Sequence, residues 1–236
     1  MINLAISIVM AAAALLVFKL VTGWSLLLLI LPALAAFSAV FYLLNRQVSR
    51  RVQALMDGVQ KDLTAGRVDK AVDSLRQGFA LAGRQFLLAS QFHGALGVLL
   101  YARKEFDDAL PHLEKSFFRD WQAQATLGAL YFQRRDHARM VEAFERAVKA
   151  GKKEGLPWSV YAYCWQKAGE NAKAQAVLAR AVEVNPTDDR LRANLTAVQN
   201  GKRIKMRAYE PAWFQFHLEK PPPELSGGRR VVWQRR

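Results

Sequence analysis

The chain has 236 residues, of which 52% are hydrophobic and 23% are charged, and its formal net charge is +14. This composition excludes an intrinsically disordered protein, and the length suits one or two domains. A single cysteine, Cys164, excludes an internal disulfide and agrees with a reducing compartment.

The first 44 residues have the composition of a membrane segment. Between residues 2 and 44 the only charged side chain is that of Lys19. One helix through this stretch would be roughly 65 Å long, about twice the hydrocarbon thickness of a bilayer, so two spans fit better than one. We therefore predict a transmembrane helical hairpin with spans at Ile2–Leu20 and Trp24–Leu44 and a turn near Gly23.

The alternative to an anchor is a cleavable signal peptide, which has a basic start and an apolar core of about 7–15 residues. The opening "MINLAIS" holds no Lys or Arg and the apolar region is far longer, so the sequence favours a retained anchor. Arg46, Arg50 and Arg51 follow the second span closely, and the positive-inside rule places them in the cytoplasm. An even number of spans then predicts a multi-pass protein of the inner (cytoplasmic) membrane with both termini and the repeats in the cytoplasm.

The residues beyond the anchor repeat a helical pattern with a period near 34. Ala147 and Ala181 are 34 positions apart, as are Tyr131 and Trp165. Small residues recur where helices must approach closely, and large residues recur at helical spacing to fill the seams between neighbours. A period of this length built from two helices predicts a stack of helix pairs with a concave face.

The repeated residues resemble the tetratricopeptide repeat (TPR) family. The fullest copy of the family pattern consists of Trp158, Tyr161, Ala162, Trp165, Gly169, Ala174, Leu178, Ala181 and Pro186. In the preceding copy Arg135 stands where the family usually has a turn glycine. The resemblance implies an α-solenoid of about four TPR-like helix pairs over residues 52–188, followed by a capping helix that stops at Gly201.

These patterns predict an all-α fold in three regions, a transmembrane helical hairpin at 1–45, a TPR-like repeat domain at 46–201 and a basic, aromatic, proline-containing tail at 202–236. The four histidines are too widely spaced for a metal signature, and no phosphate-binding loop is present. Cys164 lies between two aromatic residues, which suits a buried and inert thiol. We expect no enzymatic activity, no cofactor and no metal site.

In the TPR family, partner segments lie along the concave face formed by the first helix of each pair. The resemblance places on that face Tyr101, Phe132, Gln133, Tyr163, Gln166 and Lys167. Some of these aromatic residues could instead fill seams between repeats, because repeat packing itself requires large side chains. Together with the predicted anchor, the resemblance implies a membrane-anchored scaffold or assembly factor that recruits protein partners through its cytoplasmic repeats.

Two alternatives remain open, and the distribution of charge suggests the first of them. Residues 45–200 hold 24 basic and 17 acidic residues, a net +7, and residues 201–236 hold nine and three, a net +6. One alternative is a basic membrane-associated module that binds RNA or anionic lipid, and the other is a structural subunit of a larger membrane complex. Scattered basic residues without a nucleic-acid motif disfavour RNA, whereas anionic headgroups suit a tethered basic domain.

The tail alternates basic residues with aromatic ones, and a disordered tail rarely carries so many aromatic residues. We predict that Trp213, Phe214 and Phe216 dock on the protein's own repeats, while residues 229–236 stay available to membrane or partner. The alternative is a solvated basic tail that contacts only lipid.

Overall fold

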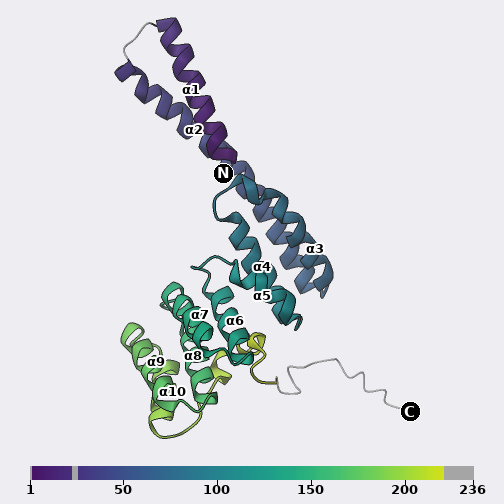
Figure 1. The fold of residues 1–236 in the computed structure, drawn as a ribbon, viewed down its shortest axis with the longest axis vertical. Coiled ribbons are helices and arrows are strands. Elements are labelled where there is room, and N and C mark those ends of the chain that lie inside the picture. Colours follow the sequence, from purple (N-terminus) through teal and green to yellow (C-terminus); the bar gives the residue numbers. More distant parts are fainter. Residues whose placement is uncertain (1, 23–25, 221–236) are drawn as a thin grey trace, which may run out of the picture. The chain divides into compact units, whose positions relative to one another are not determined.

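The structure is a computed structural model that describes residues 2–22 and 26–220. Within these ranges the regular elements are α-helices and short 3₁₀ helices, without a strand (Figure 1), which confirms the all-α prediction for the described residues. The chain divides into two compact units, Met1–Leu99 with Lys115–Phe117 and Leu100–Glu114 with Phe118–Arg236. Neither unit begins or ends at residue 45 or 201, the boundaries that the sequence patterns suggest.

The first unit begins with two long helices that lie side by side, α1 (Ile2–Thr22) and α2 (Leu26–Thr64) (Figure 1). Among the described residues, Ile2–Leu20 is the one stretch long and apolar enough to cross a membrane, with 19 residues and a mean hydropathy of 2.2. Its large side chains are mostly exposed, including Val9 at 65% and Leu20 at 78%. The apolar character of α1 therefore does not come from packing inside this protein.

The predicted second span, Trp24–Leu44, begins outside the described residues, as does the predicted turn at Gly23. The described part of the span belongs to α2, which continues past Arg46 without a break and ends at Thr64. The sequence that follows the apolar run is rich in strong helix formers, so nothing ends the helix where the apolar composition ends. The helix stops instead before Gly66, whose φ of +73° a glycine adopts without strain.

α3 (Val68–Gly78) packs against α2 within the first unit. Ala71 and Leu75 of α3 are fully buried. Gly78 lies so close to Phe92 that a Cβ added at Gly78 would come within 3.0 Å of the Phe92 ring. This contact shows why a residue without a side chain ends α3. The elements that follow α3 are η1 (Phe79–Arg84) and α4 (Leu88–Ala102).

The second unit contains the end of α4 and six further α-helices in its described part. These are α5 (Phe106–Glu114), α6 (Trp121–Gln133), α7 (His137–Ala150), α8 (Gly155–Lys167), α9 (Asn171–Val184) and α10 (Asp189–Gln199). From α5 onward each helix contacts the next, and α8 also contacts α6 and α10. At the seam between α6 and α7 a Cβ on Gly128 would come within 2.7 Å of the Phe144 ring. Phe144 in turn stacks on Tyr161 with ring centroids 5.0 Å apart.

Five helix ends in the described chain share one turn geometry. In each, a residue with positive φ is followed by a residue whose N–H donates to the carbonyl five positions earlier, at 2.8–3.0 Å. This bond satisfies a carbonyl that the helix end would otherwise leave unpaired. The positive-φ residues are Gly66, Lys104, Arg135, Gly169 and Gly201. Arg135 thus adopts the left-handed conformation that glycine adopts at the matching positions 66, 169 and 201, and the described helices are repeat-like.

Candidate protein-interaction face

The six residues that the sequence places on a concave face come from the ends of three helices. Tyr101 lies at the end of α4, Phe132 and Gln133 end α6, and Tyr163, Gln166 and Lys167 lie in the last turns of α8. The amide of Gln133 donates to the Tyr101 hydroxyl at 3.0 Å, which joins the ends of α4 and α6. Lys167 places its ammonium 5.3 Å from the centre of the Tyr163 ring.

Four of these six residues contact the chain's own C-terminal segment, defined here as residues 202–219. The four are Tyr101, Gln133, Tyr163 and Gln166. The segment leaves α10 at Gly201 and contains two short 3₁₀ helices, η2 (Arg207–Tyr209) and η3 (Ala212–Phe216). The face that the sequence assigns to a partner is therefore occupied by this segment.

Trp213 is the largest side chain that the C-terminal segment buries, with 1% of its surface exposed. Its ring meets the Tyr163 ring edge-on, with centroids 4.7 Å apart. The carboxylate of Glu219 accepts hydrogen bonds from both residues, from the Tyr163 hydroxyl at 2.6 Å and from the Trp213 indole N–H at 3.3 Å. The apolar contact and the shared carboxylate together fix this end of the segment on α8.

Phe216 is fully buried, and its main-chain carbonyl accepts a hydrogen bond from the Tyr101 hydroxyl. The Gln133 amide lies 3.4 Å from the carbonyl of His217, the next residue. The imidazole Nε2 of His217 donates to the carbonyl of Ala102 at 3.1 Å. Polar groups of α4 and α6 thus satisfy the main chain where the segment turns.

Earlier residues of the segment contact α8. The Gln166 side chain donates to the carbonyl of Lys202 at 3.0 Å and accepts from the N–H of Ile204 at 2.9 Å. Tyr209 hydrogen-bonds to the buried Ser159 hydroxyl, 3.0 Å away. The segment therefore runs along α8 with main-chain and side-chain bonds along its length.

Burial sets the protonation of the contacting groups. Burial, followed by the nearby Glu219 carboxylate, raises the pKa of Tyr163. Burial also raises the pKa of Tyr101. Both hydroxyls therefore remain donors across the physiological pH range. Burial lowers the pKa of His217 below its ordinary value of 6.5, which favours the neutral ring in the folded protein.

The remaining predicted site residues have other surroundings. Phe132 lies beside His137, with ring centroids 6.4 Å apart. Phe214, predicted to dock with its neighbours, is only half-buried. The basic residues 229–236 lie outside the described residues.

A second hollow on the same unit, the α7–α9 groove, has an accessible volume of about 510 Å³. Its apolar floor includes Val148 of α7, Trp158 of α8 and Val184 of α9. Four cationic and two acidic side chains line the groove, which are Arg146, Lys149, Lys152, Arg180, Glu145 and Glu183.

Arg180 and Glu145 neutralise each other in this groove. The two terminal guanidinium nitrogens of Arg180 each lie 2.8 Å from a Glu145 carboxylate oxygen, and this hydrogen-bonded pairing lowers the pKa of Glu145. The three other cations face a single acid, so the groove has a net positive charge. An adjoining hollow is lined by Arg119, Arg146 and Lys149 and by no acid among the described residues, which extends the positive surface along α7.

The Lys152 carbonyl accepts hydrogen bonds from the Trp158 indole N–H at 3.2 Å and from the Asn185 amide at 2.9 Å. These two bonds hold the loop that carries Lys152 beside the groove. No sequence pattern indicates this groove, because its residues come from three helices and one loop without a shared motif. The sequence signal that could have indicated the groove is the pair of basic residues Arg146 and Lys149, three positions apart on α7.

Within the described residues no three His, Cys, Asp or Glu side chains gather where they could hold a metal ion. Cys164 is fully buried, and burial raises the pKa of its thiol well above the ordinary value, which keeps the sulfur protonated. No family model matches this sequence, and no curated protein is significantly similar to it.

Proposed function

We propose that this protein is a membrane-anchored scaffold or assembly factor that recruits a partner protein through the α7–α9 groove. The observation that carries the proposal is the attachment of an exposed apolar helix, α1, to a chain that bears a positively charged groove with an apolar floor. The first feature suits a bilayer and the second suits another protein.

The anchor is argued from the surface of α1. The helix exposes large apolar side chains along its whole length, including Ile8, Val9, Leu16, Val17 and Leu20. Exposing this much contiguous apolar surface to water is costly, since burial contributes about 25 cal/mol per Å². A bilayer removes that cost. The apolar part of α2 forms the second span, so the membrane region is a hairpin.

Topology follows from the basic residues on α2. Arg46, Arg50 and Arg51 lie directly after the apolar run, and few basic residues flank the other end of the hairpin. By the positive-inside rule the helical region and both termini face the cytoplasm, in a multi-pass protein of the inner (cytoplasmic) membrane.

The remaining helices form a TPR-like solenoid of about four pairs with α10 as the cap. The five matching helix ends, at positions 66, 104, 135, 169 and 201, support this reading because one turn geometry recurs at intervals of 31–38 residues. Repeats of this kind present extended surfaces and commonly act in binding.

The partner surface in this proposal is the α7–α9 groove, because the C-terminal segment already contacts four of the six residues that the resemblance assigns to partner binding. Trp158 is 3% exposed and supplies a rigid apolar floor. Lys149 and Lys152 stand exposed at the rim. An acidic peptide segment with one bulky apolar side chain fits this combination, since the apolar group would fill the floor and carboxylates would meet the lysines.

A second candidate function is supported by the same positive charge. Arg119, Arg146 and Lys149 could bind RNA or anionic lipid without an apolar contact. Salt separates the two, because log affinity for RNA falls linearly and steeply with log salt concentration, whereas apolar capture changes little.

The test is co-purification of the full chain from gently solubilised membranes, with the retained proteins identified by mass spectrometry. The test variant carries Lys149→Glu and Lys152→Glu. The control carries Lys104→Glu and Lys115→Glu, which change the net charge equally at exposed positions outside the groove. We expect specific proteins to be retained by wild type and control and lost from the test variant. Equal retention by all three would overturn the α7–α9 groove as the partner surface.

A further inference from the structure

The hollow that adjoins the α7–α9 groove, called here the Phe118 hollow, has a volume of about 430 Å³. It is lined by Phe118, Arg119, Arg146, Lys149 and Ala150. Arg146 and Lys149 also line the α7–α9 groove. The two hollows therefore share one wall, and together they form a continuous surface across α7.

Helical spacing explains how one helix lines both hollows. Glu145 and Val148, which line the α7–α9 groove, lie on one face of α7, and Arg146 and Ala150 lie on the neighbouring face. Lys149 lies between these two faces. A ligand that fills both hollows must therefore pass over the Arg146 and Lys149 side chains.

A close approach of two helices positions the Phe118 hollow. A Cβ added at Gly151, directly after α7, would come within 2.8 Å of the Trp121 ring at the start of α6. Glycine at this position lets the end of α7 lie against α6. Phe118 and Arg119, which precede α6 in the chain, thereby come to lie beside Ala150.

Each hollow offers an apolar surface. The Phe118 ring is 56% exposed, and the Arg119 guanidinium lies 5.5 Å from its centre. The α7–α9 groove has the apolar floor that contains Trp158 and Val184. A bulky apolar side chain of a ligand would lose its contact with water in either hollow, which favours binding.

The shared wall carries the positive charge of the surface. The Nε of Arg146 donates to the Gln124 side-chain oxygen at 2.7 Å, and Gln124 is only 2% exposed, so this bond fixes the guanidinium on α7. Lys149 is exposed three positions further along the helix. The two cations thus suit successive carboxylates of a passing chain, and they need not meet at a single anion.

The width of α7 sets the spacing of the ligand's apolar groups. A chain that passes over one helix spans about 10–12 Å, and an extended backbone advances about 3.3 Å per residue. The two apolar side chains are therefore about three or four positions apart. A separation of four positions keeps both on the same side of an extended chain, which is the side that faces α7.

We propose that the partner segment passes over α7 in an extended conformation and places one bulky apolar side chain in each hollow. Acidic residues between these two anchors lie opposite Arg146 and Lys149. An acidic peptide suits the surface, because the described side chains that line the Phe118 hollow include three cations and no acid. This inference rests on the proposed function, and it specifies the sequence that the partner carries.

Fluorescence anisotropy of labelled peptides with the full-length protein in detergent tests the two anchors. The two-anchor peptide contains Trp-Glu-Glu-Glu-Phe, and the single-anchor peptide has serine in place of the phenylalanine. We expect the two-anchor peptide to bind about tenfold more tightly, because it buries one more large apolar side chain. A third peptide with glutamine in place of each glutamate should bind more weakly than the two-anchor peptide.

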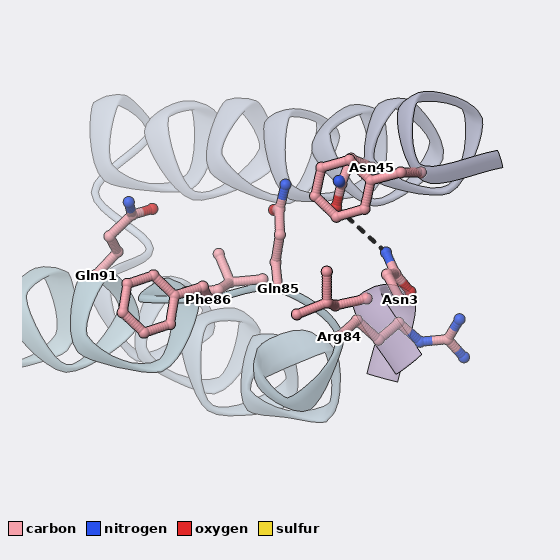
Figure 2. A pocket seen from close by; sticks show the side chains of 9 residues that line it. Asn3, Asn45, Arg84, Gln85, Phe86 and Gln91 are labelled. Carbon is pink, nitrogen blue, oxygen red and sulfur yellow. Dashed lines mark hydrogen bonds between the residues drawn. The ribbon is translucent and has the colours of Figure 1, made fainter. Parts of the chain in front are cut away.

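Phe118→Ala should lower the affinity for the two-anchor peptide to that for the single-anchor peptide, which the α7–α9 groove holds alone. Phe118→Leu keeps an apolar side chain and should retain most of the affinity. Phe86→Ala is the matched control, because Phe86 is an exposed phenylalanine that lines a different hollow, in the first unit. Figure 2 shows that the Arg84 side chain points away from that hollow, so Phe86→Ala should leave the affinity unchanged.

Equal affinity for the two-anchor and single-anchor peptides, or two-anchor binding unchanged by Phe118→Ala, would overturn the inference. Failure of both peptides to bind would overturn it as well. Co-purification then separates this failure from failure of the proposed function. Proteins lost only from the variant with Lys149→Glu and Lys152→Glu would still support the α7–α9 groove, and equal retention by all variants would contradict both proposals.

Competition identifies any other occupant of the surface. We expect unlabelled two-anchor peptide to displace the labelled peptide at a lower concentration than an RNA oligonucleotide or phosphatidylglycerol vesicles do. Stronger displacement by RNA or by the vesicles would overturn the peptide as the ligand and assign the surface to that competitor.

Discussion

The Tyr101 hydroxyl donates a hydrogen bond to the main-chain carbonyl of Phe216, 115 positions further along the chain. Tyr101 is fully buried and Phe216 is fully buried, so the bond lies away from water where an unpaired carbonyl would be costly. This contact fastens the C-terminal segment to the end of α4. It also removes Tyr101 from the surface that a partner could contact.

Replacing Trp213 with alanine should release the C-terminal segment. The side chain is 1% exposed, and truncating a buried tryptophan costs about 3–5 kcal/mol. Hydrogen exchange on the full-length protein should then be faster at the amides of residues 202–219. Phe214→Ala is the control, because Phe214 is only half-buried and its loss should change exchange little. Rapid exchange of this segment already in wild type would show that it does not dock.

Acidification should loosen the same segment through His217. Burial depresses the folded-state pKa of His217 below 6.5, so the unfolded or undocked chain takes up the proton first as pH falls. The stability that neutral His217 contributes is complete above the unfolded pKa and is lost as pH falls toward the folded pKa.

Comparison of tryptophan fluorescence and hydrogen exchange at pH 7.5 and pH 5.5 measures this effect. Residues 202–219 should lose protection at the lower pH after correction for the intrinsic exchange rate. The loss should be smaller in His217→Gln, whose side chain does not titrate. A pH response of equal size in wild type and variant would assign it to other groups.

The seam between α8 and α9 should not tolerate a larger residue. Ala181 is completely buried in α9, and forcing a phenylalanine into a packed seam costs about 1–3 kcal/mol. Ala181→Phe should therefore lower the melting temperature of the full chain. Ala176→Phe on the same helix is the control, since Ala176 is exposed and its replacement should leave the melting temperature near wild type. Identical melting temperatures of the two variants would mean that Ala181 does not lie in a packed seam between α8 and α9.

A charge on the exposed face of α1 should impair membrane insertion. Val9 is 65% exposed near the middle of the apolar stretch, where a lysine adds about 2.5–3.5 kcal/mol to the cost of insertion. Val9→Lys should increase the fraction of protein that alkaline carbonate extracts. Met56 lies on α2 beyond the apolar run and is 39% exposed, so alkaline carbonate should extract the same fraction of Met56→Lys as of wild type. Unchanged extraction of Val9→Lys would place that face of α1 outside the bilayer core.

Local patterns were enough to predict the helices but not where every helix ends. The spacing of Ala147 and Ala181 identified positions that the structure buries completely. The sequence predicted a span at Trp24–Leu44 from composition alone, and α2 continues beyond it to Thr64, because a change from apolar to basic residues marks a change of surroundings and not a break in the backbone. Arg135 shows that a turn geometry can persist without the glycine that usually marks it.

The candidate sites were harder to foresee because they depend on contacts between distant residues. Aromatic residues in the tail indicated docking, but nothing in the sequence pairs Glu219 with Tyr163, which lie 56 positions apart. The Trp158 floor of the α7–α9 groove depends likewise on the placement of three helices. Such sites follow from tertiary packing, which a repeat period alone does not specify.

Photo-crosslinking from position 149 in intact membranes tests whether the α7–α9 groove binds a partner protein. A photoreactive amino acid replaces Lys149 at the rim of the α7–α9 groove, and the products are separated by mass. We expect a crosslink to a discrete protein that carries an acidic segment, and loss of this product when Trp158→Ala removes the apolar floor. Crosslinks to lipid or nucleic acid alone, or a protein crosslink unaffected by Trp158→Ala, would contradict it.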